Sequence, residues 1–370
     1  MRAPVPLRLT VIVGLLACCS TALAAPQYTA TRLDPVDTLW VRVNGINASG
    51  QVVAEALTSG AAGAHAVVVS VGTMTDLGTL GGPWSSGSGI NASGQVAGTS
   101  YTIGTPGVRA FIYSGGSMTA LGTLGGNDSS AAGINASGQV VGESYTNGDA
   151  DEHAFLYSAG TMTDLGTLGG TWSTGRGIND SGQVVGVSST SGDTEAHAFL
   201  YSAGTMTDLG TLGGSMSGAS GINASGQVVG MSTTSGDTEL RAFMYSAGTM
   251  TDLGSLGGRM SGALGINASG QIVGFSLTSG DTEMHAFLYS GGTMTDLNDL
   301  IDPQSGWVLH GMEGIFINDA GQIATTGCNS AGRNCHALLL TPIASDIPEP
   351  STLALLGLGG TALLCRRRRH

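Results

Sequence analysis

Short apolar runs separated by glycine-rich polar clusters recur along most of the chain. In the copy that begins at Thr205 the runs are MTDL, GI, QVVGM and AFMY, and the clusters between them are rich in Gly, Ser, Asn and Asp. Such runs and clusters predict strands and turns, and no segment shows a sustained helical period. The pattern therefore predicts an all-β protein.

The runs belong to a repeat of 44 residues. GINASGQVVG at 221–230 has near-copies that start at Gly45, Gly89, Gly133, Gly177 and Gly265, and a divergent copy starts at Phe316. The same step is kept by an asparagine at Asn47, Asn91, Asn135, Asn179, Asn223 and Asn267, followed by Asn318. A leucine, first seen at Leu33, keeps it too. Seven copies result, and the last contains a seven-residue insertion between Leu297 and Asn318.

Four strands per repeat are typical of one blade of a β-propeller. HAFLY and QVVG are apolar at consecutive positions, which favours sheets buried on both faces. The opening run YTATRL aligns with TMTDL, so a blade boundary before the Gly-Ile-Asn strand lets the N-terminal strand complete the seventh blade beside HALLL. We therefore predict a seven-bladed β-propeller over residues 26–343. A β-solenoid is the alternative.

The two ends read as targeting segments. Residues 1–24 carry Arg2 and Arg8, an apolar run over 9–17 and then Ala22-Leu23-Ala24, which is typical of a signal peptide. Residues 344–370 form a linker and tail, in which Pro348-Glu349-Pro350 precede fourteen uncharged residues at 352–365. Four arginines follow, Arg366, Arg367, Arg368 and Arg369.

This tail closely resembles the PEP-CTERM sorting signal of exported bacterial proteins. The resemblance implies an exosortase as processing partner and a location at the cell surface or outside the cell. It also implies transient anchoring in the inner membrane, because the arginines mark a cytoplasmic end. An ordinary single-pass transmembrane helix is the alternative.

Charge and cysteine content agree with an exported protein. The chain has 26 acidic and 13 basic residues, and six of the basic residues lie in the two ends. So acidic a domain repels a phosphate backbone, which argues against nucleic-acid binding. Between the ends, Cys328 and Cys335 remain as one pair, and we expect a disulfide between them.

One position of the repeat alternates between histidine and arginine. It holds His65, Arg109, His153, His197, Arg241, His285 and His336. Both side chains donate hydrogen bonds, whereas arginine cannot bind a metal, so we expect a structural role. Expected acceptors in the neighbouring strand are Asp76, Asp164, Asp208, Asp252 and Asp296.

These positions also carry a family resemblance. His-Ala-Phe at 153–155, 197–199 and 285–287, with Arg-Ala-Phe at 109–111 and 241–243, resembles the HAF-type extracellular repeat of bacterial secreted proteins. The resemblance covers about residues 27–341. Copies one and seven depart from it, with His-Ala-Val at 65–67 and His-Ala-Leu at 336–338. It implies an extracellular compartment and no particular activity.

Two further sets of repeated residues are candidate binding groups. Paired acids on short glycine loops can bind Ca²⁺, although a solvated turn is the alternative. They are Asp149 and Asp151, Asp193 and Glu195, Asp237 and Glu239, and Asp281 and Glu283. A large side chain also recurs at Trp40, Trp84, Trp172, Met216 and Met260, with Asp128 as the exception. These side chains either stack on sugars or wedge between blades.

No hydrolase, zinc-protease, phosphate-loop or nucleotide-binding motif is present. We therefore predict a non-catalytic binding or structural scaffold, exported to the cell surface or extracellular matrix, with no cofactor other than Ca²⁺ as a candidate. The alternatives are a lectin that binds extracellular polysaccharide, or a secreted enzyme. An enzyme would use the 299–313 insertion, with Asp302, His310 and Glu313.

Overall fold

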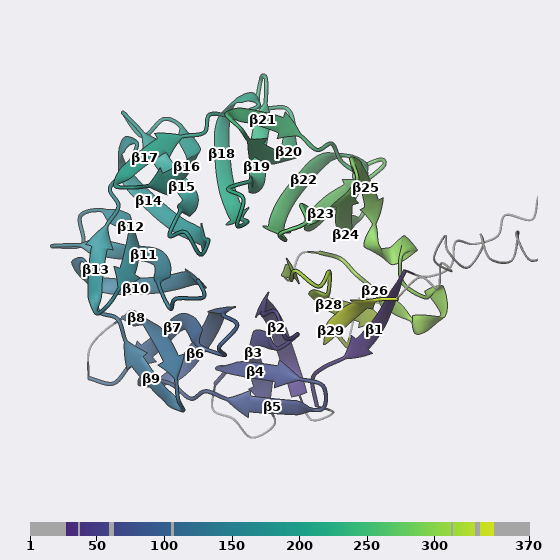
Figure 1. The fold of residues 1–370 in the computed structure, drawn as a ribbon, viewed down its shortest axis with the longest axis horizontal. Helices are drawn as coiled ribbons and strands as arrows, with labels where there is room; N and C mark the ends of the chain where they lie inside the picture. Colours follow the sequence, from purple (N-terminus) through teal and green to yellow (C-terminus); the bar gives the residue numbers. More distant parts are fainter. Residues whose placement is uncertain are drawn as a thin grey trace, which may run out of the picture.

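The computed structural model describes residues 27–35, 38–58, 63–104, 107–311, 314–329 and 334–343. Within these ranges the strands form seven antiparallel blades set around a common centre, the arrangement of a β-propeller (Figure 1). The predicted fold class is therefore confirmed. The predicted signal peptide and sorting tail lie outside the described residues.

Each of the first six blades has four strands in chain order from the centre outward. The innermost strands are β2 (Thr38–Ile46), β6 (Gly81–Ile90), β10 (Gly125–Ile134), β14 (Gly169–Ile178), β18 (Gly213–Ile222) and β22 (Gly257–Ile266). The second strands are β3 (Val52–Thr58), β7 (Val96–Thr102), β11 (Val140–Thr146), β15 (Val184–Thr190), β19 (Val228–Thr234) and β23 (Ile272–Thr278). The third strands are β4 (His65–Ser70), β8 (Val108–Ser114), β12 (Glu152–Ser158), β16 (Ala196–Ser202), β20 (Leu240–Ser246) and β24 (Met284–Ser290). The outermost strands are β5 (Thr73–Asp76), β9 (Ser117–Ala120), β13 (Thr161–Asp164), β17 (Thr205–Asp208), β21 (Thr249–Asp252) and β25 (Thr293–Asp296).

The seventh blade joins both ends of the domain. Its strands are β27 (Ile315–Ile317), β28 (Ile323–Asn329), β29 (His336–Pro342) and, outermost, β1 (Tyr28–Arg32). The insertion that precedes it forms two short 3-10 turns, η1 (Leu297–Asp299) and η2 (Pro303–Ser305), and a strand, β26 (Trp307–Val308), beside β28. The blade boundary therefore falls where the sequence predicted it, before the Gly-Ile-Asn strand.

The core of a blade is built on a phenylalanine that faces a glycine across two strands. Phe111 is fully buried and lies opposite Gly98, where an added Cβ would be 2.7 Å from the Phe111 ring. The glycine is thus required by close packing. Blades one and seven lack the phenylalanine, and the facing residue is larger: Ala54 faces Val67, and Thr325 faces Leu338.

Buried serines connect each of blades two to six to the blade before it. The Ser85 hydroxyl in β6 accepts a hydrogen bond from the Ala66 N–H at 2.9 Å and donates to the Gly78 carbonyl at 2.6 Å. The same pair of bonds recurs at Ser129, Ser173, Ser217 and Ser261. Each serine satisfies two backbone groups that the strand ladders leave unpaired, and an unpaired buried group is costly.

The repeated asparagine forms a circuit around one face of the propeller. Its side-chain amide donates to the backbone carbonyl of the corresponding asparagine in the next blade, from Asn47 to Asn91 at 3.2 Å and onward through every copy. The last of these bonds runs from Asn318 back to the Asn47 carbonyl at 3.0 Å. All seven asparagines are buried. They therefore connect neighbouring blades as well as turns within a blade.

The asparagine side chain also fixes the turn that follows it. Asn223 Oδ1 accepts from the Ser225 and Gln227 backbone N–H groups at 3.2 and 3.0 Å. Only the glycine of the turn, Gly226, has a positive φ, at 79°. A positive φ therefore accounts for the glycine of the turn and not for the asparagine. The side-chain hydrogen bonds of Asn223 explain why asparagine stands there.

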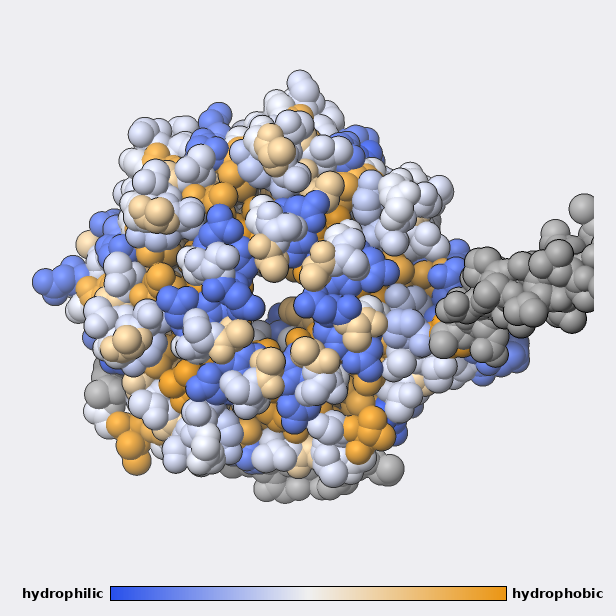
Figure 2. All heavy atoms as spheres, viewed as in Figure 1, coloured by the Kyte–Doolittle hydropathy of each residue, from blue (hydrophilic) through white to orange (hydrophobic). Residues whose placement is uncertain are grey.

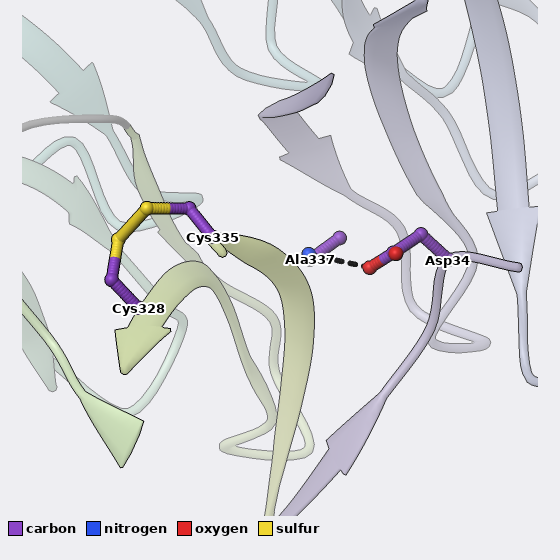
Figure 3. The surroundings of a disulfide bond; sticks show 4 residues. All are labelled: Asp34, Cys328, Cys335 and Ala337. Carbon is purple, nitrogen blue, oxygen red and sulfur yellow. Dashed lines mark hydrogen bonds between the residues drawn. A yellow bond between two sulfur atoms is a disulfide. The ribbon is translucent and has the colours of Figure 1, made fainter. Parts of the chain in front are cut away.

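Asp34 occupies the seam between the first and last strands. β1 pairs antiparallel with β29, with Arg32 opposite Leu338, as the N-terminal run predicted. The buried Asp34 carboxylate accepts from the Ala337 N–H at 2.8 Å (Figure 3). It also accepts from His336 Nδ1 at 2.8 Å. Val41 stands where the linking serine would lie. Asp34 therefore supplies the acceptor for Ala337 that serine supplies for Ala66.

The seventh blade also holds the predicted disulfide. Cys328 at the end of β28 is bonded to Cys335, just before β29 (Figure 3). The two residues are separated by seven positions. Chain-entropy arguments give so short a loop a stabilisation of about 2–3 kcal/mol. The prediction of a disulfide is confirmed.

Strand ladders alone do not connect all the blades. Single parallel pairs such as Glu152–Trp172 join blades three to six, whereas the first, second and seventh blades form separate sheets. The first and seventh blades are in contact through β2, which packs on β27, β28 and β29, and through the Asn318–Asn47 hydrogen bond. Side-chain bonds and packing thus replace backbone pairing at these junctions.

We predict that Asn223→Ala lowers the free energy of unfolding by about 1–3 kcal/mol, because it removes the acceptor of the Gln227 N–H and the buried bond that joins Asn223 to the Asn267 carbonyl of the next blade. Urea unfolding measures this. Ser225→Ala in the same exposed turn is the control and is expected to change stability by less than about 0.5 kcal/mol. Equal effects of the two substitutions would contradict a connecting role for the asparagine.

We predict that deletion of residues 27–33 exposes the edge of β29 and promotes association between chains, because an unpaired strand edge is a template for pairing. Light scattering and thermal unfolding measure the result. A chain that ends at residue 343 keeps both β1 and β29 and is the control. A deletion variant that stays monomeric with an unchanged melting temperature would favour an open array.

Candidate functional site

The innermost strands surround a central cavity of about 660 Å³. Figure 2 shows an opening at the centre of one face, rimmed largely by hydrophilic residues. Because all blades contribute to the wall, the cavity collects residues that are far apart in the sequence. Cavities of this size are typical of sites for small molecules.

The wall of this cavity has a polar part and an apolar part. Polar and charged residues come from the first five blades: Arg42, Asn44, Ser86, Ser88, Ser130, Glu143, Arg176 and Ser220. The large apolar residues come from the last two blades: Met260, Leu264, Phe275, Met284 and Phe316. Since the blades are near-copies, this division arises from substitutions at only a few repeat positions.

Arg176 and Glu143 are departures from the repeat. Arg176 in β14 stands where other copies have small, polar or aliphatic residues: Asn44, Ser88, Ala132, Ser220 and Leu264. Glu143 in β11 stands where they have Glu55, Thr99, Val187, Met231 and Phe275. Neither residue was predicted from the sequence, because the predicted sites lay in repeated residues and in the insertion. The signal that could have revealed them is a charged residue at a variable repeat position on an inner strand.

The pKa of the Glu143 carboxyl is raised to about 7, mainly by burial and also by the charge of the nearby Glu152. A hydrogen bond from Ser130 and the positive charge of Arg176 act in the opposite direction. The Arg176 side chain is accessible from the cavity, yet the surrounding protein desolvates it and lowers the pKa of its guanidinium. The pair therefore lies in an environment that disfavours charge.

Glu55, at the repeat position of Glu143, has a different role. Its Oε1 accepts a hydrogen bond from Trp84 Nε1 at 2.7 Å, and the Trp84 ring meets Tyr101 edge to face. Other large residues of this series lie at blade junctions, where Trp172 pairs with Glu152, but Trp40 and Met216 are 42% and 54% exposed. They are thus both at junctions and on the rim. Sugar stacking stays a prediction.

The histidines of the repeat are engaged in structure. Nδ1 of His65, His153, His197 and His285 contacts Asp76, Asp164, Asp208 and Asp296, at distances from 2.5 to 2.9 Å. The arginines depart from this scheme. Arg241 donates to the Gly258 carbonyl and pairs with Glu239, whereas Asp252 accepts from the Gly254 N–H. The expected Arg241–Asp252 pair is not formed, because Arg241 is engaged by the Gly258 carbonyl and Glu239 instead.

The acidic loops bind the protein itself. Asp149, Asp193, Asp237 and Asp281 have φ of 53–55°, and each accepts a backbone N–H of its own innermost strand at 2.7 Å. This backbone bond lowers the pKa of Asp193 and Asp281, and for Asp237 the Thr233 hydroxyl contributes most.

The second acids of these loops have partners on the third strand. Glu239 pairs with Arg241 at 2.7 Å, and Glu283 contacts His285 at 3.2 Å. Among the described residues no group of three or more His, Cys, Asp or Glu side chains is placed to hold a metal ion. The Ca²⁺ hypothesis gains no geometric support and stays a prediction.

The insertion does not assemble a catalytic group within the described residues. Asp302 Oδ1 accepts the Gln304 N–H and so caps η2, and no hydrogen bond or ion pair joins Asp302 to His310. The insertion also supplies the Leu309 carbonyl, which accepts the Ala286 N–H at 3.0 Å in place of a linking serine. Glu313 lies outside the described residues.

Comparison with known proteins identifies the tail. Residues 346–369 match the PEP-CTERM protein-sorting motif. The motif marks an exported protein that an exosortase sorts, at the cell surface or secreted. The match gives no support to the HAF-type assignment of the repeats, which stays a prediction. No curated protein matches the chain.

One solved structure, from Agrobacterium tumefaciens and described as TolB, is 10% identical in sequence, with 82% of this chain and 91% of that chain covered and a TM-score of 0.45. Similarity at this level carries no information on function. Among the described residues no helix is long and apolar enough to span a membrane. The apolar run at 352–365 lies outside them.

We predict that Glu143→Gln makes the protein more stable than wild type at pH 8. The folded pKa of about 7 lies above the ordinary value of 4.5, so the unfolded chain binds fewer protons between these values. Stability should therefore fall as pH rises from 4.5 to 7 and stay lowered above pH 7, and the variant should show a smaller fall. Urea unfolding at pH 5 and pH 8 measures the free energy of unfolding of wild type and variant. Glu195→Gln, on an outer loop, is the control. Identical pH dependence in wild type and Glu143→Gln would contradict the raised pKa.

Proposed function

We propose that this protein is a non-catalytic binding scaffold that an exosortase releases at the cell surface. The observation that carries the proposal is the match of residues 346–369 to the PEP-CTERM sorting motif. It identifies the route by which the chain is exported and the enzyme class that processes it. The propeller is then the part that acts outside the cell.

The hydrogen-bond network supports a scaffold over an enzyme. The repeated serines, asparagines and most of the repeated histidines and acids bind neighbouring protein groups, so they are occupied by structure. An enzyme needs a general base or nucleophile held against a substrate site by a partner. The polar residues of the central cavity are mainly serines, with one carboxylate and two guanidinium groups. This set suits binding.

The tail suits temporary anchoring. β29 ends at Pro342 and the Pro-Glu-Pro of the sorting motif begins at Pro348, so only a short stretch of chain separates the folded domain from the anchor. A helix of fourteen residues would span about 21 Å, less than the roughly 30 Å of the hydrocarbon core. Such a segment is a marginal anchor. Arg366 to Arg369 resist passage through hydrocarbon and so keep the end of the chain in the cytoplasm.

We predict opposite effects for two changes in the tail. Alanine at Pro348, Glu349 and Pro350 should leave uncut protein in the membrane fraction, because the processing motif is lost while the anchor remains. Serine at Arg366 to Arg369 should give uncut protein in the soluble fraction, because nothing then stops the tail. Fractionation and intact-mass measurement distinguish the two.

The wild-type surface protein provides the control for both variants. Its C-terminal peptides should end before the apolar run at 352–365. Recovery of a peptide that contains this run from the native surface protein would contradict processing, as would identical fractionation of the two variants.

A further inference from the structure

We propose that the central cavity binds a small molecule that carries a carboxylate on an apolar body, with Arg176 as the anchor for the carboxylate. The inference rests on the proposed binding role of the propeller and names the class of ligand. It is independent of how the tail is processed.

The arginines of the chain differ in the partners of their side chains. The chain has no lysine, and the described part of it contains six arginines: Arg32, Arg42, Arg109, Arg176, Arg241 and Arg259. Four of them bind carboxylates or backbone carbonyls through their side chains. Among the described residues, no hydrogen bond or ion pair engages the side chain of Arg42 or Arg176, and both line the cavity. Glu143 acts on Arg176 through its charge. In a protein with twice as many acidic as basic residues, two guanidinium groups outside ion pairs thus face one space.

The space around Arg176 leaves its guanidinium open to the cavity. The side chain is exposed and lines the cavity wall, and its Nη1 lies beside Gly218 of the next blade. A planar guanidinium with free N–H groups binds a carboxylate through two parallel hydrogen bonds, which gives both strength and direction.

Another part of the wall has the opposite chemistry. Met260 and Leu264 in β22, Phe275 in β23 and Met284 in β24 present an apolar surface to the same cavity. Burial of an apolar body against it is favourable in proportion to the area removed from water. A cavity with an apolar wall and few convergent polar groups is the usual form of a small-molecule site. A purely polar anion would leave this wall unused.

Glu143 then tunes the site. The charged groups that face it are Glu152 on β12 and Arg176 on β14, and Ser130 on β10 donates a hydrogen bond to it. Asp128 raises the pKa of Glu152 in turn. Arg42 on β2 adds positive charge to the same cavity. When Glu143 is ionised it competes with an incoming carboxylate for Arg176. When it is protonated this competition ends, so a carboxylate binds more tightly at pH 6 than at pH 8.

The test uses 2-naphthoate as the probe and 2-naphthol as its neutral analogue, with the full mature domain. We expect naphthoate to bind at least about tenfold more tightly than naphthol, because one charge-assisted pair corresponds to about that factor. Arg176→Gln should remove this preference. Arg259→Gln removes an equal charge from an exposed ion pair with Asp281 that does not line the cavity. This variant should retain the preference for naphthoate.

A second readout keeps the test valid where a variant folds poorly. In wild-type protein with labelled methionine methyl groups, naphthoate should shift the signals of Met260 and Met284, whereas those of Met206 and Met250, near outer strands, should stay unchanged. Glu143→Gln should bind naphthoate more tightly at pH 8 and lose the pH dependence.

Three results would overturn the proposal: equal affinity for naphthoate and naphthol, equal loss of affinity in the Arg176 and Arg259 variants, or shifts confined to outer methionines. A cavity that binds nothing, in protein whose tail is processed as predicted, would refute this inference and leave the sorting role intact. Binding in protein whose tail is not processed would do the reverse.

Discussion

The structure depends on satisfying backbone groups where one blade meets the next. Antiparallel ladders pair strands within a blade, but they leave N–H and carbonyl groups facing the junctions. Burying these groups without hydrogen-bond partners would lower the stability of the fold. Serine and asparagine side chains provide the missing partners in every regular junction. Because each is small and sits in a fixed place of the repeat, one solution serves all copies. This explains why the same serine and asparagine recur in the copies of the repeat although no catalytic or binding role is assigned to them.

The two irregular junctions show how strong this requirement is. The linking serine is absent at the start of the seventh blade and at the seam between the chain ends. At the first of these the insertion supplies the Leu309 carbonyl, and at the second Asp34 supplies a buried carboxylate. One acceptor is a backbone carbonyl and the other is a carboxylate. Each nevertheless accepts the alanine N–H at the same repeat position, from Ala286 and from Ala337. The seam adds β1 pairing and a disulfide, so the ends of the domain are held together by several independent interactions.

The repeat leaves the centre of the propeller free to vary. The Arg176 side chain makes no hydrogen bond or ion pair across a junction with the described residues, so a substitution there leaves the connecting bonds intact. The result is a cavity whose polar and apolar parts lie on different blades, although the blades themselves are near-copies. At this centre burial raises the pKa of Glu143, and the charge of Arg176 opposes the shift. The connecting bonds thus lie where the copies agree, and the proposed binding site lies where they differ.

The sequence by itself determined the all-β class, the number of blades, the blade boundary, the pairing of the first strand with the last and the disulfide. These follow from period, local strand and turn preferences, and cysteine count, which are all properties of nearby residues or of regular spacing. The His–Asp pairs could be predicted for the same reason, since one hairpin brings them together. Only the tertiary structure decided that Asn47 and its equivalents connect neighbouring blades, that Asp34 replaces a serine, and that Arg42, Glu143 and Arg176 share one cavity. Each of these depends on how blades sit beside one another around the centre, and a contact between blades leaves no local pattern in the chain.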